Sequence, residues 1–178
     1  MNTTSLKSLL IIGSIATILG GNITPIKAEQ EIKFFCGTTY EEKSNSYKPT
    51  TFIWHPRGKI RLIQWEKKLG GKSPEKRCIE VSQNWQTTYS NGNLGLTLIT
   101  NGKMNGNKVI CTAKKSGGKC DNLLMTLRED DNSLDVLNHL RDILSGYQVG
   151  PVKHSSGEPQ IYYQIDFNNF LKNAPVEK

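Results

Sequence analysis

The stretch Ser73–Trp85, with the sequence SPEKRCIEVSQNW, decides the fold. Ser73 is a favourable helix cap, and Pro74 stands at the first helical position, where its missing N–H costs nothing. Residues at helical spacing then build one apolar face, which consists of Cys78, Val81, Trp85 and Tyr89. The pair Asn91-Gly92 supplies a stop. The sequence therefore predicts a helix over residues 74–89 that packs on a sheet, with Trp85 in the core rather than stacked on a ligand.

Three strands are expected before this helix. Residues 32–36 and 50–54 are short runs rich in aromatic and β-branched side chains, and a polar loop that ends at Pro49 separates them. The turn at residues 56–58 leads into residues 59–65, where polar and apolar side chains alternate. The three runs predict an antiparallel meander.

A hairpin, a further strand and a second helix are expected after the first helix. Residues 94–100 and 108–113 predict two strands, joined by the Gly- and Asn-rich connection 101–107. Residues 123–127 predict the next strand. The second helix starts at Asp131, Asn132 or Ser133 and ends at Gly146. Its apolar positions are Val136, Leu137, Leu140, Ile143 and Leu144.

The order of these elements is three strands and a helix, followed by three strands and a helix. This order predicts an α+β fold, with a largely antiparallel sheet of about six strands (βββα-βββα) and the two main helices packed on it. We expect this domain to span residues 29–146. Residues 147–178 would form a C-terminal extension, with a strand at 161–166 and a short helix at 167–172.

Residues 1–28 have the three parts of a secretory signal. Lys7 lies in a polar start, residues 9–19 are apolar, and Ala28 precedes the cleavage point. A membrane anchor is the alternative, but a spanning helix needs roughly 20 apolar residues, which is more than this run supplies. We expect cleavage after Ala28 and export of residues 29–178 to the periplasm, the thylakoid lumen or the medium.

Charge is unevenly distributed along the chain, whose formal net charge is +7. Residues 57–120 hold 13 basic and three acidic side chains, whereas residues 121–178 hold five basic and nine acidic ones. Two interpretations remain open, namely a basic face for an anionic surface and internal pairing of the two segments. The candidate contacts to an anionic surface are Arg57, Lys59, Arg61, Lys103, Lys108, Lys114 and Lys115.

Four cysteines, Cys36, Cys78, Cys111 and Cys120, indicate two disulfides in an exported chain. Three connectivities are possible for four cysteines. The simplest one joins Cys111 to Cys120 across a turn-like segment, which leaves Cys36 to pair with Cys78. A zinc site does not fit, because no two cysteines stand two to four residues apart.

Residues 29–178 contain none of the common motifs of catalytic chemistry. We find no Gly-x-Ser-x-Gly elbow, no His-Glu-x-x-His spacing, no Cys-x-x-Cys pair and no Walker pattern in residues 29–178. His55, His139 and His154 are isolated, and the carboxylates lie in loops or at a helix start. We therefore expect no catalytic residues, no metal and no cofactor.

Several short motifs resemble one family in the same order along the chain. They are Phe34-Phe35-Cys36, Pro49-Thr50-Thr51, Ile63-Gln64-Trp65, Pro74–Ser82, Gly102–Gly106, Val109-Ile110-Cys111, and Cys120 with Leu123-Leu124 and Thr126-Leu127. Together they resemble the circadian oscillating protein family of cyanobacteria, over residues 32–144. The resemblance implies an exported protein that is peripheral to a membrane. It brings no established activity and no catalytic residues.

These observations predict an exported, disulfide-stabilised, non-enzymatic domain that associates with an anionic membrane surface or an extracytoplasmic protein partner. An extracytoplasmic enzyme or small-ligand-binding protein, with a site not visible in the sequence, is the alternative. A third interpretation is binding of a peptide at an exposed sheet edge. We expect no nucleic acid as a partner, because the chain is exported, and the oligomeric state stays open.

Overall fold

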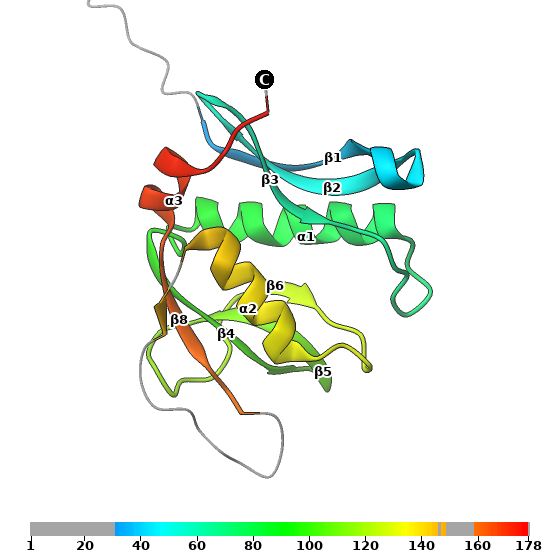
Figure 1. Ribbon diagram of the computed structural model, residues 1–178. Coiled ribbons are helices and arrows are strands. Elements are labelled where there is room, and N and C mark those ends of the chain that lie inside the picture. Colours follow the sequence, from blue (N-terminus) through cyan, green and yellow to red (C-terminus); the bar gives the residue numbers. More distant parts are fainter. Residues whose placement is uncertain (1–30, 146, 149–158, 178) are drawn as a thin grey trace, which may run out of the picture.

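The computed structural model describes residues 31–145, 147–148 and 159–177 (Figure 1). The predicted signal, residues 1–28, lies outside this part of the chain. The strands are β1 (Lys33–Glu41), β2 (Ser46–His55), β3 (Gly58–Gln64), β4 (Leu96–Met104), β5 (Asn107–Ala113), β6 (Leu123–Thr126), β7 (Tyr147–Gln148) and β8 (Tyr162–Asp166). The helices are the 3-10 helix η1 (Glu42–Ser44) and the α-helices α1 (Pro74–Ser90), α2 (Ser133–Leu144) and α3 (Phe167–Asn173).

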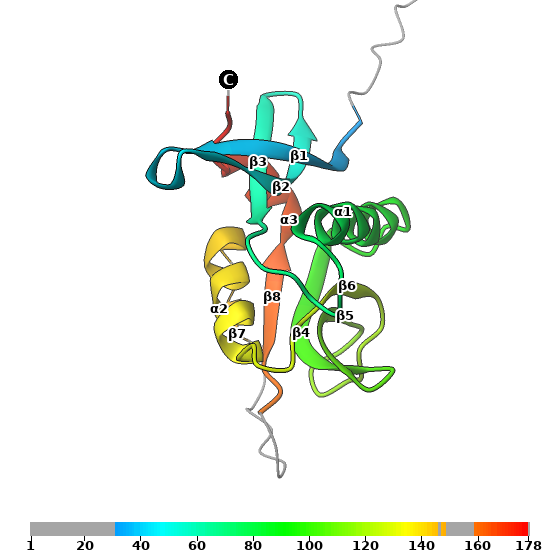
Figure 2. The ribbon, with the colours of Figure 1, turned by 90° about the vertical axis from the view of Figure 1, so that its right-hand side faces the viewer.

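The strands form two antiparallel sheets, with the orders β1-β2-β3 and β6-β5-β4-β8-β7. The α+β class is confirmed, but the strands do not share the one sheet expected from the sequence. Helix α1 separates them, because it packs on β1 and β2 and also contacts β6 (Figures 1 and 2). Helix α2 covers the second sheet at β4, β5 and β8. The strands after α1 are thereby kept from pairing with those before it.

Helix α1 forms as its sequence predicts. The Ser73 hydroxyl accepts a hydrogen bond from the Lys76 N–H at 3.4 Å, which caps the first turn. Trp85 is fully buried, so its predicted place in the core is confirmed. The ring centroid of Trp85 lies 5.7 Å from that of Phe34 on β1. The Phe34 centroid lies 5.9 Å from that of Phe167 on α3. These rings join the first strand, the first helix and the last helix in one core.

The first two strands are longer than predicted, so Pro49 stands inside β2 rather than in a loop. The Pro49 carbonyl accepts a hydrogen bond from the Trp65 N–H at 2.8 Å. The Pro49 nitrogen is on the same edge of β2 as its carbonyl, and β3 has already ended there, at Gln64. The N–H that proline lacks therefore has no strand to pair with, and the residue is tolerated.

The hairpin of β4 and β5 closes through the two-residue turn Asn105-Gly106. Both residues have positive φ angles, 50° and 79°, as in a type I′ turn. The connection is shorter than the predicted 101–107, and Asn101 belongs to β4 instead. Its buried side chain accepts from the Ile161 N–H and donates to the Pro159 carbonyl, each at 3.0 Å.

Residues 159–177 are part of the same folding unit rather than an extension of it. Strand β8 pairs with β4 inside the five-stranded sheet. Five side chains from β8 and α3 are in the core: Tyr163, Ile165, Phe167, Phe170 and Leu171. The strand and helix expected in this segment are present, at Tyr162–Asp166 and Phe167–Asn173.

Both disulfides pair as predicted, Cys36 with Cys78 and Cys111 with Cys120. The first joins β1 to α1, and the second closes the segment between β5 and β6. Two formed disulfides indicate an oxidising, extracytoplasmic environment. No helix within the described residues is long and apolar enough to span a membrane.

Candidate functional site

The seven basic residues singled out in the sequence lie in three separate places. Arg57, Lys59 and Arg61 are on the hairpin of β2 and β3. Lys103 and Lys108 flank the turn between β4 and β5. Lys114 and Lys115 lie in the segment that the second disulfide closes. The fold therefore does not bring the seven together on one face.

The first group is partly engaged with the C-terminal residues. The Arg57 guanidinium donates to the backbone carbonyls of Leu171 and Ala174, at 2.5 and 3.1 Å, and so holds the end of α3. Lys59 and Arg61 share the carboxylate of Glu177, at 3.6 and 2.5 Å. These contacts anchor the chain end to the edge strand β3, where Glu177 also donates its N–H to the Lys59 carbonyl at 2.7 Å.

The side of the three-stranded sheet that faces away from α1 carries an aromatic row. Cross-strand partners share a face, and the register pairs Phe35 with Phe52 and Lys33 with Trp54. The same register places Lys59 beside Trp54 and Arg61 beside Phe52. We call these six residues, Lys33, Phe35, Phe52, Trp54, Lys59 and Arg61, the outer aromatic face.

Aromatic and cationic groups are interleaved on the outer aromatic face. The Phe35 and Phe52 rings stack at 5.5 Å, and the Lys59 ammonium stands 5.2 Å from the Phe52 centroid. Phe52 is thus 1% exposed although it belongs to no core cluster. Gly37 makes room for it, since a Cβ there would come within 3.1 Å of the Phe52 ring. Trp54, at the end of the row, is 48% exposed.

Arg77 is a buried basic residue that connects several elements, and the sequence does not indicate this role. It is on α1 and 8% exposed, with its guanidinium 4.6 Å from the Trp65 ring centroid. It donates to the backbone carbonyls of Lys67 and Thr126, at 3.2 and 3.3 Å. Burial lowers the pKa of Arg77, and the carboxylate of Asp131 opposes this. Arg77 therefore joins α1, the loop before it and β6.

Asp131 stands at the start of α2 and holds the Arg128 side chain. Its carboxylate accepts from Nε, Nη2 and the backbone N–H of Arg128, at 3.0, 2.7 and 2.9 Å. Burial is the largest single effect on the pKa of Asp131 and raises it. The hydrogen bonds and charge of Arg128 together outweigh burial, so the pKa lies below its ordinary value.

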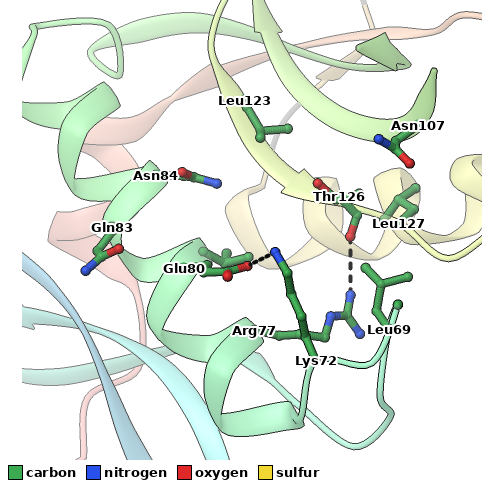
Figure 3. Close-up of a pocket in the computed structure, with 12 residues that line it drawn as sticks. Leu69, Lys72, Arg77, Glu80, Gln83, Asn84, Asn107, Leu123, Thr126 and Leu127 are labelled. Atoms are coloured by element: carbon green, nitrogen blue, oxygen red, sulfur yellow. Dashed lines mark hydrogen bonds and ion pairs between the residues drawn. The ribbon is translucent and has the colours of Figure 1, made fainter. Parts of the chain in front are cut away.

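Two cavities adjoin this junction on the loop before α1. The first, which we call the amide cavity, has a volume of ≈ 430 Å³ (Figure 3). Its polar lining residues include Gln83, Asn84 and Asn107. Figure 3 shows the Lys72 side chain extended to Glu80, with which it pairs at 2.7 Å. The charged groups of this cavity are thus paired or bound to carbonyls.

The second cavity has a volume of ≈ 540 Å³, and we call it the basic cavity. Its charged lining residues are Lys68, Lys103, Lys108, Arg128 and Glu129. Two of these, Lys103 and Lys108, were predicted to contact an anion, whereas Lys68 and Arg128 were not. No sequence spacing connects them, because they come from three segments that meet only in the fold.

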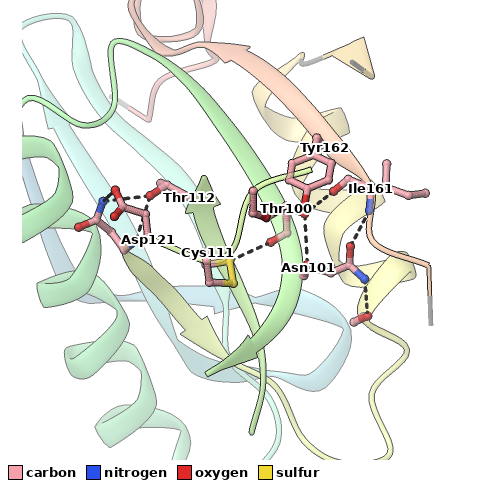
Figure 4. Close-up of a disulfide and its surroundings, with 11 residues drawn as sticks. Thr100, Asn101, Cys111, Thr112, Asp121, Ile161 and Tyr162 are labelled. Atoms are coloured by element: carbon pink, nitrogen blue, oxygen red, sulfur yellow. Dashed lines mark hydrogen bonds between the residues drawn. A yellow bond between two sulfur atoms is a disulfide. The ribbon is translucent and has the colours of Figure 1, made fainter. Parts of the chain in front are cut away.

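Figure 4 shows the second disulfide among polar side chains that hydrogen-bond to the backbone or to one another. Near it, the Tyr162 hydroxyl donates to the Gly118 carbonyl at 2.6 Å, and Lys114 pairs with Asp121 at 3.4 Å. Burial raises the pKa of the Tyr162 phenol. These contacts fix the segment between β5 and β6, and they indicate a structural role.

Three sheet edges are occupied by side chains or backbone. On β6, the Leu124 and Thr126 carbonyls accept from Asn84 and Arg77. On β1, the Phe34 N–H donates to Gln86 at 2.7 Å, and β3 pairs with Glu177 as described. A peptide that adds at these positions would have to displace such contacts.

The histidines that the structure describes are not part of an evident acid–base or metal centre. Burial and the charge of Arg57 lower the pKa of His55, whose Nδ1 accepts from the Arg57 N–H. His139 is on the exposed side of α2, and His154 lies outside the described residues. Within the ranges that the structure covers, no group of three His, Cys, Asp or Glu side chains could hold a metal ion.

Comparison with known proteins identifies a family. The family model described as circadian oscillating protein COP23 matches residues 33–172, which include every element from β1 to the last turns of α3. No curated protein and no solved structure matches the chain.

Proposed function

The chain belongs to the circadian oscillating protein COP23 family, and on that basis we propose that it is an exported, non-enzymatic domain that docks on an anionic membrane surface. The docking surface is the outer aromatic face. The two disulfides support the extracytoplasmic location. The peripheral mode suits a fold whose described helices do not span a bilayer.

The half-exposed Trp54 among cations is the observation that carries this proposal. Tryptophan favours the membrane interface, because its indole has an apolar body and a polar N–H. Lys33, Lys59 and Arg61 stand on the same face, and a basic residue near an anionic leaflet contributes about 1 kcal/mol. Figures 1 and 2 show α1 on the other side of this sheet, and no described element covers the outer side.

The remaining charges of the face favour an anionic partner. Its basic residues are Lys33, Lys59 and Arg61, and the carboxylate of Glu177 pairs with the last two. Three basic groups against this one acidic group leave a net charge of +2. An extracytoplasmic protein with an acidic, apolar surface is the other partner that would fit, and the vesicle experiment distinguishes the two.

Cosedimentation of the exported chain with vesicles tests the proposal. We expect binding to vesicles that contain phosphatidylglycerol, no binding to phosphatidylcholine alone, and loss of binding when salt rises from about 0.05 to 0.5 M. Trp54→Ser should weaken partitioning about five- to ten-fold. Tyr47→Ser is the matched control, because Tyr47 is an exposed aromatic residue on β2 whose position alternates to the opposite face. Equal effects of the two substitutions would contradict docking through this face.

A further inference from the structure

The basic cavity gathers four cationic side chains, which differ in how far they are paired. Of its charged lining residues, Arg128 pairs with Asp130 and Asp131. Lys108 donates to the backbone carbonyl of Asp131 at 3.2 Å. Neither Lys103 nor Lys68 has an ion pair within the described part of the chain. The charge of Lys68 contributes to the lowered pKa of Glu75. Glu129 is the one acidic residue of the lining.

We propose that the basic cavity binds the phosphate or sulfate group of a polyhydroxylated molecule. The cations come from the loop before α1, from both strands of the β4–β5 hairpin and from the start of the β6–α2 connection, so they converge from different directions. A tetrahedral oxyanion accepts hydrogen bonds on several sides and suits such a set. The cavity is far larger than a phosphate group alone needs, which leaves room for part of an organic ligand.

Backbone turns shape two walls of the basic cavity. Leu69 and Lys72 exchange backbone hydrogen bonds, at 3.1 and 2.8 Å, around Gly70-Gly71. The β4–β5 turn supplies Gly106 on the other wall. Gly70 and Gly106 both have positive φ angles, 53° and 79°, which allow each turn to be tight.

The amide cavity continues the basic cavity. The two share four lining residues, which are Leu69, Gly70, Asn107 and Leu127. Beyond this shared part, the amide cavity offers the neutral side chains of Gln83 and Asn84 and the paired charges of Lys72 and Glu80. Amide groups both donate and accept, as recognition of hydroxyl groups requires. The joined groove thus fits an anionic group at one end and a sugar-like body at the other.

This inference does not depend on membrane docking. The basic cavity lies at the β4–β5 turn and the loop before α1, whereas the outer aromatic face is on the far side of the three-stranded sheet from α1 (Figure 1). Either proposal can therefore fail alone. The same oxyanion chemistry could come from a soluble phosphosugar or from a phosphorylated lipid headgroup, and separate arms of the experiment distinguish these sources.

Titration calorimetry of the full exported chain tests the cavity with glucose 6-phosphate, inorganic phosphate and glucose. We expect the strongest binding for glucose 6-phosphate, weaker binding for phosphate and none for glucose. Amide shifts of Gly70 and Gly106 in NMR spectra should accompany binding. A second arm uses phosphatidylcholine vesicles with and without phosphatidylinositol 4-phosphate. Binding in that arm alone would identify a headgroup as the ligand, and it supports the cavity if Trp54→Ser retains it while Lys68→Gln with Lys103→Gln loses it.

Matched double variants decide whether the basic cavity is the site of ligand binding. Lys68→Gln with Lys103→Gln should weaken binding about 25-fold, since each lysine near the anion contributes about five-fold. Lys115→Gln with Lys119→Gln removes the same charge from exposed positions in the disulfide segment and should change affinity less than two-fold. Both pairs should leave the midpoint of thermal unfolding unchanged. Absence of wild-type binding in both arms, or equal losses in the two variants, would overturn the proposal.

Discussion

Arg77 joins three parts of the chain that are distant in the sequence. Its position in the first turns of α1 looked like that of an ordinary exposed basic residue, since the apolar stripe of the helix runs through Cys78 and Val81. In the fold, it stacks on Trp65 and bonds to two carbonyls. The sequence could not indicate this role, because both carbonyls belong to other elements.

Replacement of Arg77 should therefore destabilise the domain. Arg77→Met leaves the Lys67 and Thr126 carbonyls without their donor, and we expect the free energy of unfolding to fall by about 2–4 kcal/mol. Lys76→Met, at the exposed neighbouring position, should change it by less than about 0.5 kcal/mol. Urea unfolding measures both, and similar losses in the two variants would argue against the buried contacts.

Asp131 gives the domain a pH-dependent contribution to stability. Its pKa is below the ordinary value in the folded state, so its contribution is complete above about pH 4 to 5 and is lost as the pH falls through the folded pKa. Asp131→Asn should be less stable than the wild type at pH 7, and the difference should shrink toward pH 3. A difference that stays constant over this range in urea titrations would contradict the ionic origin.

The first helix and the strand meanders could be predicted because their signals are local. The cap at Ser73 and the apolar stripe that includes Trp85 fix α1. The division into two sheets could not be predicted, because β4 pairs with β8, more than 50 residues later in the chain. Alternation shows which face of a strand is buried, but it does not identify a distant partner.

The two disulfides should contribute unequally, because they close loops of different length. The sequence separations are 42 residues for Cys36–Cys78 and 9 for Cys111–Cys120. In the chain-entropy model, these correspond to about 4 and about 2.5 kcal/mol. Paired replacement by alanine should therefore lower the midpoint of urea unfolding more for the first bridge. The reverse order would show that contacts around the second bridge dominate.

At the scale of the whole molecule, the uneven charge of the sequence has two outcomes. Some basic residues of the central segment pair with the C-terminal part, as Arg61 does with Glu177 and Lys114 with Asp121. Others, such as Lys103, line the basic cavity without a partner among the described residues. Internal pairing thus accounts for some of the basic residues, and others stay available to an anionic partner. The cavity itself could not be foreseen, because it exists only where the loop before α1, the β4–β5 hairpin and the β6–α2 connection meet.

The exposure of the outer aromatic face follows from the division of the strands into two sheets. Trp54 and Phe52 stood in a predicted strand, but the sequence did not show which neighbours would cover them. The separation into two sheets leaves that face of β2 without a covering helix, so Trp54 stays half exposed while the tryptophans Trp65 and Trp85 are buried. Trp54 is therefore a natural reporter of contact between this face and a lipid surface.

Quenching of tryptophan fluorescence by brominated phosphatidylglycerol vesicles tests membrane docking most directly. Bromine quenches an indole only at short range, and the other two tryptophans, Trp65 and Trp85, are 4% and 0% exposed. We predict salt-sensitive quenching of the wild-type chain, together with a blue shift of its emission, and loss of the quenched component in Trp54→Phe. Binding to these vesicles without quenching of Trp54, or quenching that persists in Trp54→Phe, would contradict docking through the outer aromatic face.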